Sequence, residues 1–92
     1  MEDSPPIPQL PLRSARHLGQ ALRRLRNLKR TTQAELADLA GLRQPTISSV
    51  ESGAEGTELS TIFAILSALD LELVVRRRQK SANSPRELLG DE

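Results

Sequence analysis

The 92-residue sequence contains no cysteine, tryptophan or tyrosine, and it has a single phenylalanine and a single histidine. Without cysteine there is no disulfide, no four-cysteine zinc site and no thiol nucleophile. One histidine leaves no metal-ligand set and no nucleophile–base pair, so we predict a protein that is not an enzyme and has no cofactor or metal. No apolar run approaches the roughly 18 residues that span a bilayer, so we expect a soluble, cytoplasmic chain without a signal peptide.

Acidic residues are missing from one stretch of the chain. Residues 13–30 hold seven basic side chains and no acid, whereas residues 31–75 hold seven acids and a single base, Arg43. The net charge of +1 therefore conceals a segregation that is able to hold a polyanion on one face. Ordinary solvated helix faces give the same pattern, so the charge alone leaves both interpretations open.

The scarcity of aromatic residues predicts a small aliphatic core. A single domain of this length buries only about 60–65% of its unfolded surface, so we expect the fold to be completed by dimerisation. Residues 1–12 hold four prolines and predict a flexible arm, residues 13–70 carry the domain, and residues 79–92 resemble a disordered tail.

Apolar spacing predicts four helices within residues 14–69. Ser14 is a suitable N-cap for a first helix that ends near Lys29. Thr32 and Glu35 form a capping box that opens a helix over residues 33–40, and Gly41 suits the left-handed position that ends it.

The third and fourth predicted helices follow closely. Pro45 fits the first turn of a helix over about residues 44–52. Thr57 is placed to cap a fourth helix over about residues 58–69, in which Phe63 is expected to lie in the core.

Residues 71–78 show the alternation of a strand, with Leu71, Leu73 and Val75 on one face. The chain offers no second strand, so we expect this dimerisation strand to pair with a copy of itself in another protomer. Continuation of the fourth helix is the alternative interpretation.

The second and third predicted helices form a helix-turn-helix candidate. Ala37 is small where the helices would cross, and Ile47 and Val50 would point back into the domain. The outward face of the third helix then carries amides and hydroxyls without a carboxylate, which suits a DNA major groove. The expected DNA-binding residues within or just before this helix are Arg43, Gln44, Pro45, Thr46, Ser48 and Ser49.

The combined spacing of several segments resembles the Xre/Cro-type helix-turn-helix family. These segments are residues 33–37, Gly41-Leu42, Gln44, residues 46–48, Glu51 and Gly53. The resemblance covers about residues 15–70 and implies an all-α, lambda-repressor-like domain of four to five helices with a C-terminal strand that pairs across a dimer. It also implies a phosphate contact by Gln33 and a structural ion pair between Arg26 and Glu51.

Two positions depart from the family pattern. The family usually has glycine at the end of its first helix, where this chain has Lys29-Arg30; a left-handed residue other than glycine would cost about 1 kcal/mol there. Pro45 has no side-chain donor and offers only apolar contact, for example to a thymine methyl group.

Residues 57–66 and 71–75 are most similar to the fourth helix and dimer strand of HipB-like antitoxins. This likeness implies a homodimer on a palindromic double-stranded DNA operator, a HipA-type kinase toxin as partner, and autorepression of the operon that encodes both. A stand-alone Xre-type regulator, such as a phage-type repressor or restriction controller, and a protein-interaction module without DNA binding remain as alternatives.

Overall fold

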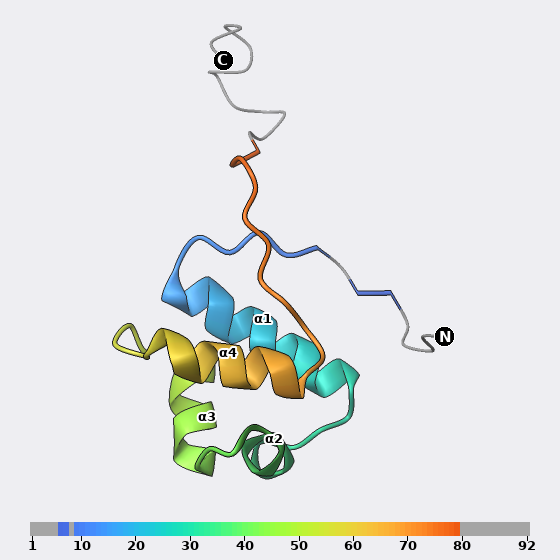
Figure 1. Cartoon of the computed structure of the whole chain (residues 1–92), viewed down its shortest axis with the longest axis vertical. Helices are drawn as coiled ribbons and strands as arrows, with labels where there is room; N and C mark the ends of the chain where they lie inside the picture. Colours follow the sequence, from blue (N-terminus) through green and yellow to red (C-terminus); the bar gives the residue numbers. More distant parts are fainter. Residues whose placement is uncertain (1–5, 8, 80–92) are drawn as a thin grey trace, which may run out of the picture.

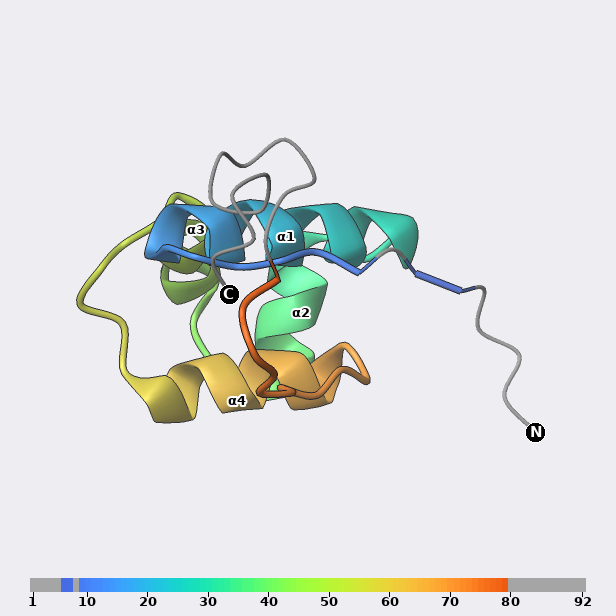
Figure 2. The same cartoon turned by 90° about the horizontal axis from the view of Figure 1, so that it is seen from above.

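This computed structural model describes residues 6–7 and 9–79, and this part of the chain contains four helices. They are α1 (Ala15–Leu28), α2 (Gln33–Ala40), α3 (Gln44–Glu51) and α4 (Leu59–Ala68). Figures 1 and 2 show α1 and α4 on opposite sides of the domain, with α2 and α3 at the end remote from the described termini. None of the described helices has the length and hydrophobicity to cross a membrane.

The predicted helix ends are confirmed where a side chain or a glycine defines them. The Ser14 hydroxyl accepts a hydrogen bond from the His17 amide at 3.0 Å. Thr32 and Glu35 form both bonds of the capping box, and Gly41 ends α2 with φ 71°. Each of these signals is local, because it depends on residues no more than a few positions apart.

The core lies where the four helices meet and is aliphatic. Its most completely buried side chains are Leu22, Leu36, Ile47 and Ile65, one from each helix. Other buried residues, among them Ala37, Val50 and Leu66, surround them, and Leu18, Leu42 and Leu71 pack against this core partly buried. One apolar face of each helix is thus removed from water, which fixes α2 and α3 relative to the other two helices.

The turn after α1 contains a strained residue. Arg30 has φ 54°, in the left-handed region that disfavours side chains other than glycine. Its amide donates to the Asn27 carbonyl at 2.9 Å, and the Thr31 amide donates to the Arg26 carbonyl at 3.2 Å. The turn therefore satisfies helix-end carbonyls without the glycine that the family usually has there.

Two expectations for α4 are wrong. Its N-cap is Glu58 rather than Thr57, whose hydroxyl instead donates to the Ala54 carbonyl at 3.2 Å and braces the preceding loop. Phe63 is 50% exposed rather than in the core. The buried stripe of α4 consists of Ile62, Ile65 and Leu66, and Phe63 is rotated by about 100° from Ile62.

The segment after α4 forms no strand as a single chain. Residues 71–79 continue without regular secondary structure, and Val75 is 97% exposed. A strand needs backbone partners, and no neighbouring segment among the described residues supplies them. The predicted strand over residues 71–78 is therefore not formed within one protomer.

The N-terminal and C-terminal segments of the described chain cross near one point in both views (Figures 1 and 2). Arg13 donates to the Gln79 carbonyl at 3.1 Å, and Arg76 donates to the Gln9 side chain at 3.3 Å. Most of the predicted tail, residues 80–92, and residues 1–5 and 8 of the predicted arm lie outside the described residues.

Candidate nucleic-acid interface

Helices α2 and α3 are joined by a short turn that holds them in contact. Gly41 supplies the left-handed residue, and the Leu42 amide donates to the Ala37 carbonyl at 2.9 Å. Ala37 is only 3% exposed, and Leu42 packs partly buried against the core. This geometry presents one side of α3 to solvent at the edge of the domain.

The solvent-facing side of α3 carries no carboxylate. Ile47 and Val50 point into the core, and Glu51, the acid of this helix, is also buried. Of the residues predicted to bind DNA from α3 and its N-cap, Arg43, Gln44, Pro45 and Ser49 are exposed, whereas Thr46 and Ser48 are half-buried. The exposed surface is therefore polar and without negative charge.

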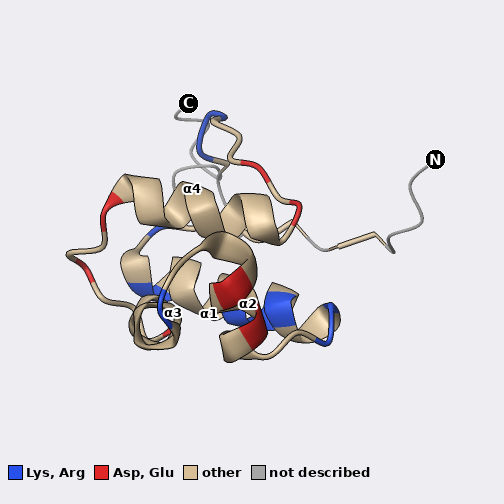
Figure 3. Ribbon diagram, turned by 60° about the horizontal axis from the view of Figure 1, so that its bottom comes forward, with Lys and Arg blue, Asp and Glu red and all other residues tan. Residues whose placement is uncertain are grey.

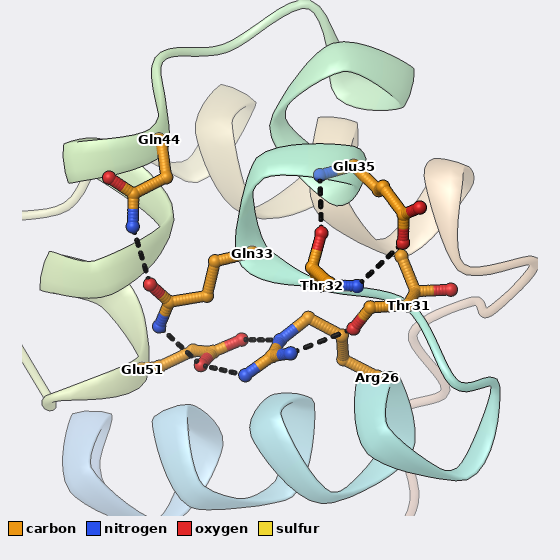
Figure 4. Close-up of polar contacts among 7 residues, drawn as sticks. All are labelled: Arg26, Thr31, Thr32, Gln33, Glu35, Gln44 and Glu51. Carbon is orange, nitrogen blue, oxygen red and sulfur yellow. Dashed lines mark hydrogen bonds and ion pairs between the residues drawn. The ribbon is translucent and has the colours of Figure 1, made fainter.

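Arg26 and Glu51 form an ion pair between α1 and α3 (Figure 4). The Arg26 Nε–Glu51 Oε2 distance is 2.6 Å, and Arg26 Nη2 donates to Oε1 at 2.9 Å. The third guanidinium nitrogen donates to the Thr31 carbonyl at 2.7 Å. Because the two side chains are only 9% and 4% exposed, this bidentate pair fixes the end of α3 against α1.

The environment of Glu51 acts on its pKa in two opposing ways. Burial raises the pKa, but hydrogen bonds from Arg26 and Gln33 and the positive charges of Arg26 and Arg23 outweigh it, so the pKa lies below its ordinary value. The bond to Glu51 likewise raises the pKa of Arg26. The pair is therefore ionised in the folded protein at neutral pH.

A chain of amide hydrogen bonds leads from this ion pair to the surface of α3. Gln33 Nε2 donates to Glu51 Oε1 at 3.0 Å, and Gln44 Nε2 donates to Gln33 Oε1 at 2.6 Å (Figure 4). The orientation of the Gln44 amide follows from this chain, since one of its two N–H groups is used. Among the described residues, no group bonds its second N–H or its carbonyl oxygen, so both are open to a ligand.

The structure thus brings Gln33 and Gln44 together, a contact that the sequence analysis missed. The two residues are eleven positions apart on different helices, and no local pattern links them. Gly19 is a second residue that no sequence pattern indicated: a Cβ at this position would lie 2.4 Å from the Val50 carbonyl oxygen. Absence of a side chain there lets α1 and α3 approach closely.

A hollow of about 460 Å³ lies beside α3, on the flank facing the loop to α4. One wall is lined by Pro45, Thr46 and Ser49, and the other by residues of the loop and the start of α4, including Glu58.

Charged residues are unevenly distributed around α2 and α3. Figure 3 shows basic stretches of α1 near α3 and α2, while acidic positions lie on α2 and the α3–α4 loop. Within the described residues, no group of side chains suits a metal ion.

A small helical domain with these features is a helix-turn-helix domain of the DNA-binding class. The family profile of helix-turn-helix proteins, HTH_3, matches residues 22–75. The chain belongs to this helix-turn-helix family and is a DNA-binding regulator of the Xre type. It is similar to HipB proteins of known structure.

Several solved structures support this assignment, although no curated protein sequence matches the chain. A HipB–O4 20mer complex contains a chain that is 33% identical, with a TM-score of 0.71; the match covers 75% of this chain and 97% of that one. A HipA–HipB–O2–O3 complex matches with the same values. The restriction-modification controller protein C.AhdI from Aeromonas hydrophila is 38% identical over 63% of this chain and 88% of that one, with a TM-score of 0.60.

Proposed function

We propose that this protein is a sequence-specific transcriptional repressor that reads DNA with the exposed side of α3. The observation that carries the proposal is the orientation of the Gln44 amide by Gln33. Its free carbonyl oxygen is able to accept from adenine N6, and its second N–H is able to donate to adenine N7. The proposed set of residues that face the bases and the DNA backbone is completed by Arg43, Pro45, Thr46, Ser48 and Ser49.

The start of α2 supports a phosphate contact at Gln33. Among the described hydrogen bonds, the main-chain N–H groups of Gln33 and Ala34 have no acceptor. Free amides at a helix N-terminus favour an anion. A phosphate at this point would set the position of Gln33, and through it the Gln44 amide that reads the base.

A Gln44→Ala substitution is expected to weaken binding to the preferred DNA by about 1–3 kcal/mol and to relax selectivity at one base pair. The preferred fragment is first selected from a random double-stranded pool with the full chain. Affinities of the two proteins are then compared at one salt concentration, with fragments altered at each position. Ser52→Ala, at the exposed C-cap of α3 and outside the proposed set, is the control. Unchanged affinity and selectivity for Gln44→Ala would remove it from the readout.

We further propose a homodimer on a palindromic operator, formed by pairing of residues 71–78 through the face of Leu71, Leu73 and Val75. The exposure of Leu73 and Val75 in a single chain supports it, because an apolar edge of this kind is stabilised by a partner. Replacing both residues by aspartate is expected to give a monomer by sedimentation equilibrium. Glu72→Lys and Arg77→Glu together, which also change charge in this segment, serve as the control, and a dimer that survives the aspartates would refute strand pairing.

The particular regulatory role that we propose is that of an antitoxin to a HipA-type kinase, repressing the operon that encodes both. Its support is the match along 97% of a HipB chain, including a chain from a complex with HipA. The similarity to C.AhdI favours a second candidate, a stand-alone controller. Affinity purification from the native cell, with the bound protein identified, separates the two: co-purification of a kinase supports the antitoxin, and its absence under conditions that retain the operator supports the controller.

A further inference from the structure

The basic side chains of α1 do not all face the same way. Arg26 points inward to Glu51, whereas Arg16, Arg23 and Arg24 are exposed. Arg16 packs beside Gly53, two residues after the end of α3, since a Cβ on Gly53 would lie 3.0 Å from the Arg16 Cα. Arg23 is near enough to α3 for its charge to act on Glu51. Both therefore lie along the edge of α1 that borders α3.

Arg24 occupies a different side of the same helix. Consecutive helical residues are rotated by about 100°, and Gly19, which touches α3, marks the direction of that helix. On this wheel, Arg23 lies about 40° from Gly19 and Arg24 about 140° from it. Two neighbouring arginines of equal charge and exposure thus differ in whether they border the α2–α3 surface.

Within the described residues, no acidic side chain forms an ion pair with Arg16 or Arg23. Residues 13–30 contain no acid, and the one ion pair found among the described residues is that of Arg26 with Glu51. The first turn of α1 has no acidic residue, and Arg16 lies there, next to the positive end of the helix dipole. Because these positive charges repel one another and the helix dipole, a bound anionic ligand would stabilise them.

We propose that Arg16 and Arg23 form a phosphate-binding edge that contacts the DNA backbone beside the α2–α3 surface. The two residues are seven positions, about two helical turns or roughly 10 Å, apart, so they reach separate phosphates. Both residues border the C-terminal end of α3, Arg23 through Glu51 and Arg16 through Gly53. The edge therefore continues the contact proposed at Gln33, whose side chain also bonds Glu51. The inference rests on the proposed DNA binding, and it adds affinity and orientation rather than sequence selectivity.

The test measures how operator affinity depends on salt for Arg16→Gln, Arg23→Gln and the matched control Arg24→Gln. Each phosphate contact contributes about 0.9 to the slope of log affinity against log salt concentration. We expect the slope to fall by about one for Arg16→Gln and for Arg23→Gln, with uniform weakening across DNA sequences, and to stay unchanged for Arg24→Gln. Thermal unfolding of each variant checks that the fold is retained.

The outcomes separate this inference from the proposed function. Wild-type protein that selects no DNA would overturn both. Selection by the wild type together with equal slopes for all three variants would overturn the phosphate edge alone, because the charge would then act generally or not at all. Binding to polyglutamate is measured in parallel as a model of an acidic protein. If the wild type binds it and the Arg16 and Arg23 variants do not, while their DNA slopes are unchanged, the edge binds an acidic protein and not the DNA backbone.

Discussion

Replacing Arg26 with methionine is expected to lower the free energy of unfolding by about 3–5 kcal/mol. Methionine retains much of the volume of the side chain but leaves the Glu51 carboxylate, 4% exposed, without its bidentate partner. The Thr31 carbonyl loses its bond from the guanidinium as well. Urea unfolding of the full chain measures the change, which is large because a domain of this size has a total stability on the order of 5–15 kcal/mol.

The double substitution Arg26→Met with Glu51→Met is the matched control. With both charges removed, the cost of an unpaired buried carboxylate disappears, so the double variant is expected to be more stable than Arg26→Met alone. It still leaves Gln33 without an acceptor on α3, and some stability is lost for that reason. Losses that simply add would show that the coupling between the two side chains is not the cause.

The pH dependence of stability is a second test of the Arg26–Glu51 ion pair, measured by urea unfolding at several pH values. In the wild type, the pKa of Glu51 is lower in the folded than in the unfolded chain, where it is about 4.3. This difference stabilises the fold above that unfolded pKa and is lost as pH falls through the folded pKa. In Arg26→Met, burial, the largest influence on this carboxyl group, is opposed only by the Gln33 hydrogen bond and the Arg23 charge. We therefore expect the pKa of Glu51 to rise and acidification from neutral pH to stabilise the variant.

Local sequence signals predicted the starts of α1 and α2 and the end of α2, although not the N-cap of α4, whereas they did not predict contacts between helices. The capping residues Ser14 and Thr32 act on amides three positions away. By contrast, Arg26 and Glu51 are 25 positions apart, and their pairing was expected only from the family resemblance. No sequence pattern predicted the orientation of Gln44 by Gln33, since it depends on how two helices pack.

The errors in α4 have the same origin. Leu59 and Phe63 continue an apolar pattern at helical spacing, and the pattern alone does not say which part of a wide stripe the neighbouring helices cover. The structure buries Ile62, Ile65 and Leu66 and leaves Phe63 at the margin. In a domain with so few covering elements, part of an apolar helix face stays in contact with water.

Gly19 shows most clearly what a helical pattern hides, and its replacement by alanine is expected to destabilise the fold by about 3 kcal/mol. In an exposed helix interior the same change stabilises by about 1 kcal/mol. Here the added Cβ would lie 2.4 Å from the Val50 carbonyl oxygen and 2.8 Å from that of Glu51. Both are backbone atoms, so α1 and α3 have to move apart, with the cost of an overpacked core. Thermal or urea unfolding measures the loss.

Gly56→Ala is the matched control, because no atom lies within 4 Å of the position that its Cβ would take and its φ is not in the left-handed region. It is expected to change stability by less than about 0.5 kcal/mol. Separation of α1 from α3 in Gly19→Ala would also lengthen the Arg26–Glu51 contact and shift Gln33 and Gln44 relative to each other. We therefore expect the variant that remains folded at low temperature to lose DNA selectivity along with stability, and equal stability of the two alanine variants would contradict the close approach of the helices.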